Sequence, residues 1–206
     1  MRRKTFDVLV SAGGLIMVAV LVVAGALLMW GYNFANSNVS SQLAQQQISF
    51  PPASAFAHPV AGSEITPSMI GTVSAFAGQS LRTGQQAQVY ANDFIAVHLK
   101  EIGAGMTYAQ ASQKAMSAPA GSAAAVKYQG MADTLFKGTT LRGLLLEAYG
   151  FSVFATIAQD GAFAAFALAA LLALLVGFGY LHARRTSDAA EILTHRAPAR
   201  GSFATA

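Results

Sequence analysis

The chain has 206 residues, 54% of them hydrophobic and 11% charged, with a net charge of +4. It contains no cysteine, which excludes disulfides, zinc thiolate sites and iron–sulfur clusters. The positive charge is concentrated at the chain ends beside apolar segments. This pattern is typical of membrane flanks and needs no nucleic-acid partner to explain it.

The first predicted element is a membrane span over residues 8–30, a run of 23 residues without a charge. A bilayer core of about 30 Å requires about 20 apolar helical residues, and buried helices of soluble proteins are rarely so apolar over this length. The run exceeds the apolar core of a cleaved signal peptide, so we expect an uncleaved anchor. Trp30, Tyr32 and Phe34 mark its outer edge, because amphipathic rings prefer the head-group level.

Residues 33–160 predict a helical domain that begins as a polar continuation of the first helix and breaks at Phe50-Pro51-Pro52. The clearest element is residues 85–102, whose apolar residues recur at helical spacing. β-Branched residues are sparse and no hairpin signal occurs, so no sheet is expected.

The second half of this domain predicts three further helices. Thr107 and Gln110 form a capping box at the start of a helix that reaches about Ser117. Ser122 caps a helix that ends at Gly138. The last helix starts at Leu141, capped by Thr139 or Thr140.

The second predicted span covers residues 161–181, a run of 21 residues without a charge. Small residues recur in it every four positions, a spacing that lets helix backbones approach closely in lipid. This predicts a packing face against the first span or against another protein. The alternative is that this spacing arises by chance, because the span is rich in glycine and alanine. The face consists of Gly161, Ala165, Ala169, Ala173 and Gly177.

The distribution of charge predicts the topology. The segments outside the two runs at the chain ends carry the whole net charge, whereas the segment between the runs is neutral. Basic residues beside membrane spans stay in the cytoplasm. We therefore expect a protein of the plasma membrane with both termini cytoplasmic and the central domain outside.

Together these elements predict an all-α fold in which two transmembrane helices flank a helical extracytoplasmic domain. The predicted divisions are a cytoplasmic N-terminus with the first span (1–32), the exterior domain (33–160), the second span (161–183) and a disordered cytoplasmic tail (184–206).

Five segments resemble a family of small actinobacterial membrane proteins: MRRKTFDVL (1–9), SFPPA (49–53), FIAVHLKE (94–101), TLRGLLLE (140–147) and HARR (182–185). Members have two spans and one exterior domain, and their function is uncharacterised. They often carry an inherited description, aromatic ring-opening dioxygenase of the LigA type. The resemblance implies an actinobacterial plasma membrane and supplies no active-site residues.

The inherited description implies non-haem iron, which needs two histidines and a carboxylate on one face of the metal. His98 and Glu101 lie one helical turn apart, and His58 could complete the set from a linker. The alternative is that His98 is a hydrogen-bonded core histidine. No nucleophile elbow, Walker motif or dinucleotide-binding motif occurs either. The sequence therefore predicts no catalytic residue, cofactor or metal, and a metal-dependent dioxygenase stays the minor alternative.

Two functional classes follow. The first is a non-enzymatic accessory or scaffold subunit of a larger membrane or cell-envelope assembly, with a membrane-protein partner or self-association. The second is an extracytoplasmic domain that binds or senses a small molecule or lipid in an apolar groove lined by Tyr90, Phe94, Ile95 and Tyr108. The short segment after Arg185 leaves no room for a cytoplasmic output module, which favours the first class.

Overall fold

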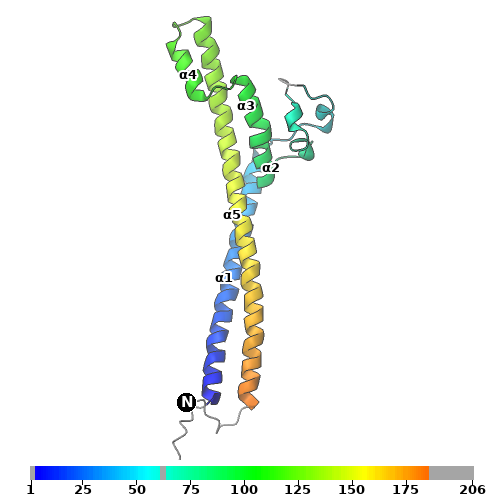
Figure 1. The fold of residues 1–206 in the computed structure, drawn as a ribbon, viewed down its shortest axis with the longest axis vertical. Coiled ribbons are helices and arrows are strands. Elements are labelled where there is room, and N and C mark those ends of the chain that lie inside the picture. The colour runs from blue at the N-terminus through cyan, green and yellow to red at the C-terminus, as the bar shows by residue number, and fades with distance from the viewer. Residues whose placement is uncertain (1–2, 61–63, 186–206) are drawn as a thin grey trace, which may run out of the picture. The chain divides into compact units, whose positions relative to one another are not determined.

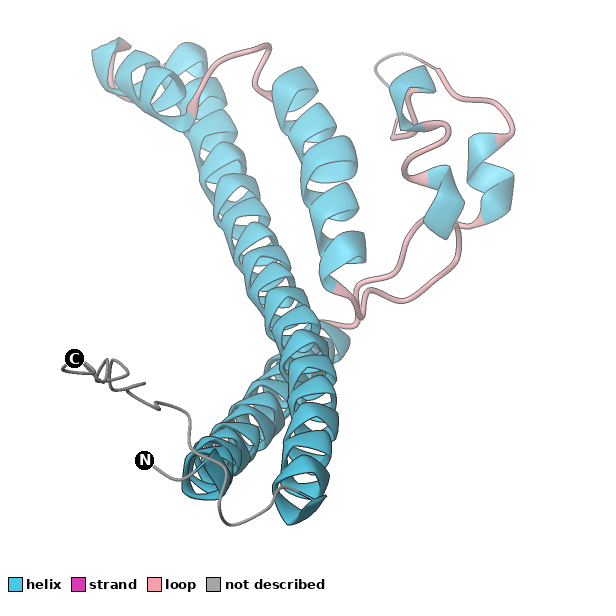
Figure 2. Ribbon diagram, turned by 60° about the horizontal axis from the view of Figure 1, so that its bottom comes forward, coloured by secondary structure: helices cyan, strands magenta, loops and turns pink. Residues whose placement is uncertain are grey.

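The computed structural model describes residues 3–60 and 64–185, and all their regular elements are helices, as predicted (Figures 1 and 2). No β-strand occurs in these two ranges; the one pairing of extended chain is an isolated bridge between Ser49 and Ser80. The α-helices are α1 (Arg3–Gln45), α2 (Gly84–Val89), α3 (Ala96–Ile102), α4 (Tyr108–Ser117) and α5 (Ala123–Arg185). Three short 3-10 helices (Ala53–Phe56, Pro67–Met69 and Ser74–Phe76) and a π-helix, η4 (Tyr90–Ile95), complete the set.

The chain divides into two compact units. Unit 1 comprises Met1–Met29 with Asp160–Ala206, and unit 2 comprises Trp30–Gln159. Each of the two long helices, α1 and α5, lies partly in unit 1 and partly in unit 2. The predicted C-terminal tail lies outside the described residues, apart from Arg184 and Arg185, which end α5.

Unit 1 contains the two apolar runs, and both helices are long and apolar enough to cross a membrane. Only 11% of the most apolar window of each helix is buried within the protein, whereas the core helix of a soluble protein is mostly buried. Large side chains such as Leu15, Ile16, Leu171 and Leu174 are more than half exposed. The surface of unit 1 is therefore apolar around the helix pair.

The two helices of unit 1 pack antiparallel in a constant register. A Cβ atom built on Gly14 would lie 2.5 Å from Val176 Cγ2, and one built on Gly25 would lie 2.7 Å from Phe166 Cε1. Farther along, Gly179 faces Ser11 and Gly161 faces Leu28. Every step along α1 is matched by an equal step back along α5. The charge-free runs consequently overlap along the length of unit 1.

The contact face of α5 follows alternating spacings of three and four residues, the pattern of helices that cross at a small angle. Its buried members are Ala162, Ala165, Ala169 and Ala183. Small side chains bring the helix backbones close together, which in lipid favours association through van der Waals contact.

The predicted every-fourth ladder coincides with this face only in part. Ala165 and Ala169 are buried and Gly161 is half-buried, but Ala173 and Gly177 are exposed. An α-helix turns about 100° per residue, so positions four apart drift by about 40° each time and the ladder winds about 160° around α5. A role for the exposed members against another protein stays a prediction.

Unit 2 has its own core, built where α1, α2 and α5 meet the chain that connects α1 to α2. Met69, Val73 and Leu81 are fully buried, and Phe50 is nearly so. Two strand-like hydrogen bonds hold the connection closed: Phe50 N donates to Gln79 O (2.9 Å) and Leu81 N donates to Ile48 O (2.9 Å). The prolines after Phe50 break the helix, and the chain folds back over its own apolar side chains.

The helix predicted over residues 85–102 is present as α2, η4 and α3 in continuous succession. Thr83 caps it, since Gln86 N donates to Thr83 Oγ1 (3.2 Å) and Thr83 N donates to Gln86 Oε1 (3.1 Å). The capping box predicted at Thr107 and Gln110 is confirmed at the start of α4.

The predicted helix break at Gly138 is wrong, because α5 runs without interruption from Ala123 to Arg185. Its start is as predicted, with Ala125 N donating to Ser122 Oγ (3.1 Å). Gly138 serves close packing instead: a Cβ atom there would overlap Leu99 Cδ2 of α3. Thr140 does not cap a new helix either, since its hydroxyl donates to Phe136 O (2.8 Å) one turn earlier.

The contact face of unit 1 predicts different costs for two chemically identical substitutions. Ala169→Leu should destabilise the α1–α5 pair by about 1–3 kcal/mol, because it forces extra volume into a buried backbone contact. Ala173→Leu should be close to neutral, since Ala173 is exposed. Unfolding in mixed detergent, followed by circular dichroism, measures both. Equal stability of the two variants would contradict the assigned face.

Candidate functional site

The histidine singled out by the sequence is held by its own helix. His98 Nδ1 lies 2.8 Å from Phe94 O, and its ring packs on the Phe94 ring with centroids 4.5 Å apart. Within residues 3–60 and 64–185, no three histidine or carboxylate side chains lie close enough to share a metal. The hypothetical triad of His58, His98 and Glu101 is therefore not assembled in the described chain.

His98 ends a series of ring contacts through unit 2. Phe50 is its centre, with ring centroids 5.3 Å from both Phe76 and Tyr90. Tyr90 packs on Phe94 at 4.8 Å. Such pairs add about 0.5–1.5 kcal/mol each beyond the area they bury. The series joins the 3-10 helix Ser74–Phe76 to η4 and stiffens the core.

The π-helix η4 lies in the middle of this series. A π-turn inserts one extra residue into a helix and is frequent at functional sites. In this protein the π-helix is joined to α5 by a side-chain hydrogen bond, in which Arg142 Nη2 donates to Asn92 Oδ1 (2.8 Å). Arg142 Nε is buried without a hydrogen-bond partner in the described chain. The π-turn positions Asn92 so that it can receive the guanidinium from α5.

Burial raises the pKa of the Tyr90 phenol, and the negative charge of Glu64 raises it further. Tyr90 is half-buried between Phe50 and Phe94, where the phenolate would lose solvation. The core around Phe50 therefore favours the neutral phenol.

Unit 2 has a largely apolar groove between α1 and α5 with a volume of about 490 Å³. Its floor includes the buried Val39, Leu43 and Leu145. Its walls include Phe34, Leu144 and Phe151, all more than half exposed.

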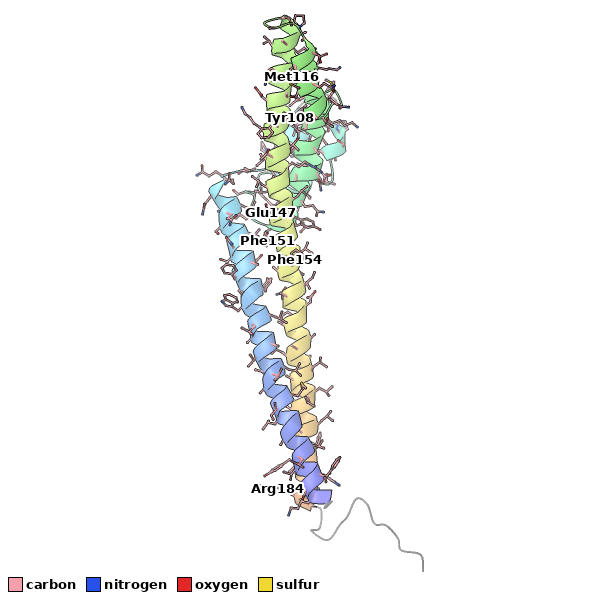
Figure 3. All side chains as sticks on the ribbon, turned by 90° about the vertical axis from the view of Figure 1, so that its left-hand side faces the viewer. Tyr108, Met116, Glu147, Phe151, Phe154 and Arg184 are labelled. Atoms are coloured by element: carbon pink, nitrogen blue, oxygen red, sulfur yellow. The ribbon has the colours of Figure 1, made fainter. Side chains whose placement is uncertain are left out.

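The apolar surface extends beyond the groove along α5. Phe154 and Ile157 are also more than half exposed, and Figure 3 shows Phe151 and Phe154 following Glu147 along the helix. The groove rim is polar, with amides from α1 and one carboxylate from α5: Asn38, Gln42, Gln46 and Glu147. A groove with exposed apolar walls and a polar rim is the kind of surface that binds an amphipathic helix or another apolar partner.

This groove differs from the one predicted from the sequence. Ile95 is buried in the core of unit 2, and Tyr90 and Phe94 belong to the ring series. Tyr108 packs on Phe136 of α5 instead, with ring centroids 5.5 Å apart. These four side chains therefore do not line one groove.

The signal for the observed groove is present in the sequence but weak. Phe34, Val39 and Leu43 are the few large apolar residues in a stretch of α1 dominated by serine, asparagine and glutamine. Their partner stripe on α5 begins only at Leu141, the start of the last predicted helix and far from Leu43 in the sequence. The groove needs both helices, so neither stripe alone indicates it.

No known protein family, curated protein or solved structure matches this chain. The resemblance to the two-span actinobacterial family consequently stays a prediction.

The environment of Tyr90 predicts a loss of stability in alkali. The unfolded chain ionises its tyrosines near pH 10, and the folded chain holds the Tyr90 proton to higher pH, so stability is intact below about pH 10 and falls above it. Tyr90→Phe should reduce this alkaline loss. Tyr108→Phe is the control and should keep it, because Tyr90 remains. Chemical unfolding at about pH 8 and pH 11 measures the difference; equal losses in Tyr90→Phe and wild type would contradict the assignment.

Proposed function

We propose that this chain is a non-enzymatic integral membrane protein that serves as an accessory or scaffold subunit of a larger membrane or cell-envelope assembly. Residues 8–30 and 161–181 span the plasma membrane, both termini are cytoplasmic, and unit 2 lies outside. The groove between α1 and α5 of unit 2 binds the partner.

The register of unit 1 supports the membrane location. Four independent contacts align the two charge-free runs over their whole length, so the pair presents one continuous apolar band. Hydropathy identifies the two runs but does not determine how the helices align with each other. An apolar band about 20 residues tall matches the thickness of a bilayer core.

The charges at the ends of that band support the orientation. Lys4, Arg184 and Arg185 lie at one end of unit 1, beside the start of α1 and the end of α5. Met29 and Asp160 lie at the other end of unit 1, where the described residues include no basic one. Basic residues are retained on the cytoplasmic side.

The observation that carries the scaffold function is the exposed apolar surface at the groove. Phe34, Leu144, Phe151, Phe154 and Ile157 are all more than half exposed within unit 2. A domain in water rarely leaves so many large apolar side chains together unless a partner covers them. The two sides of the groove are helices, which favours a helical partner from a neighbouring membrane protein.

A second candidate function, binding of a small molecule or lipid outside the membrane, uses the same groove. A volume of about 490 Å³ falls within the range of about 300–1,000 Å³ typical of ligand pockets. The two functions differ in what covers the apolar walls, a protein or a lipid.

The orientation is tested with single cysteines, since the native chain has none. A cysteine at Ser80 should react with an impermeant maleimide in intact cells, and one at Ser202 should react only after lysis. The charges at the ends of unit 1 motivate this outcome. The reverse labelling pattern would contradict the orientation.

The scaffold function is tested by photo-crosslinking in native membranes. A benzophenone amino acid in place of Phe154 should yield one discrete crosslinked product, in which the chain is joined to a single partner protein. The control is the same probe at Val126, an exposed residue of α5 about 20 Å or more from the groove. A product that contains only lipid would favour the second function, and equal products from both positions would contradict a defined interface.

A further inference from the structure

Unit 1 contains a cavity of about 420 Å³ at the end of the apolar band where the chain termini lie. It lies between the first turns of α1 and the last turns of α5. Leu175 and Phe178 form outer walls and are more than half exposed, so the cavity opens sideways, away from the helix contact. In a membrane this opening faces lipid.

The lining of the cavity changes from polar to apolar along the helices. Asp7 and His182 lie at the terminal end, and Gly14 and Leu172 lie toward the middle of the band. The register that pairs Ser11 with Gly179 and Gly14 with Val176 places these ends about 10 Å apart along α1. This direction matches a lipid in the inner leaflet, with its head group at the membrane edge and its acyl chain toward the centre.

Asp7 supplies an acceptor at the polar end. Its Oδ2 is inaccessible to solvent and has no hydrogen-bond partner among the described residues. A buried acceptor without a donor is costly, and more so when it belongs to a carboxylate. A ligand hydroxyl would satisfy it once the Asp7 side chain rotates toward the cavity that it lines.

The basic residues around the same end supply charge complementarity for a phosphate. Lys4 lies one turn before Asp7 on α1, and Arg184 and Arg185 follow His182 on α5. The Arg184 guanidinium packs over the Tyr180 ring at 4.8 Å, which holds it near the helix end. Arginine is well suited to phosphate because its planar fork donates two parallel hydrogen bonds.

We propose that this cavity binds one anionic phospholipid whose head group bears hydroxyls. The acyl chain lies along the apolar lining and the phosphate lies beside Arg184 and Arg185. A head-group hydroxyl donates to Asp7 Oδ2 after the Asp7 side chain rotates toward the cavity. The proposal rests on the proposed membrane location but not on the partner at the groove of unit 2.

The test offers three lipids with identical acyl chains to the full chain, extracted in mild detergent and stripped of lipid. Phosphatidylglycerol has charge and hydroxyls, phosphatidylmethanol has charge alone, and phosphatidylcholine has neither net charge nor hydroxyls. Native mass spectrometry counts the bound lipids. Wild type should retain one phosphatidylglycerol, in preference to phosphatidylmethanol by about tenfold, as expected for one added hydrogen bond to a charged group. It should also retain phosphatidylmethanol in preference to phosphatidylcholine, because of the negative charge.

Two kinds of variant separate the parts of the site. Asp7→Leu should abolish the preference for phosphatidylglycerol over phosphatidylmethanol and keep the preference of both over phosphatidylcholine. Leu172→Phe fills the cavity and should remove the bound lipid, whereas Leu171→Phe, on the adjacent exposed position, should retain it.

Retention of either other lipid as strongly as phosphatidylglycerol by wild type would overturn the proposal, as would equal retention by Leu172→Phe and Leu171→Phe. If the Asp7→Leu variant does not fold, the comparison of Leu172→Phe with Leu171→Phe still tests whether the cavity binds lipid. Failure of the scaffold function would appear only in the crosslinking of unit 2. A wrong membrane location would appear earlier, when the chain is recovered without detergent.

Discussion

The close approach of two helix backbones in unit 1 is the constraint on which the rest of the protein depends. Gly14 and Gly25 leave room for Val176 and Phe166, and the alanines of α5 keep the opposite surface low. A contact of this kind has little hydrophobic driving force in lipid. Its stability comes from van der Waals packing between complementary surfaces. Because it fixes one register, it also fixes which residues of α1 and α5 share each level of the apolar band.

Features that depend on neighbours in sequence were predictable. The apolar runs, the capping box at Thr107 and the N-cap at Ser122 all rest on spacings of a few residues, and the all-helical fold followed from them. Gly138 was misjudged because a glycine that ends a helix and a glycine that admits a neighbour look alike until Leu99 is seen beside it.

The candidate sites were less predictable because both need two distant segments. The groove of unit 2 combines Phe34 of α1 with Phe151 of α5, and the terminal cavity of unit 1 combines Asp7 with His182. A hydropathy profile records Asp7 only as the charge that bounds a span. Its buried, unpartnered oxygen becomes evident when α5 is placed against it.

The π-helix η4 sets the phase of α3 relative to α2. Its widened turn takes up one extra residue, and in the resulting phase Leu99 of α3 meets Gly138. If the same residues formed an ordinary α-helix, α3 would turn by about 100° relative to α2, and Leu99 would leave the notch at Gly138. Removing one residue between Tyr90 and Ile95 would instead close the wide turn and leave α3 in its present phase. Among homologues of this chain, a one-residue deletion inside this helix should therefore accompany loss of the π-turn and leave the contact at Gly138 in place.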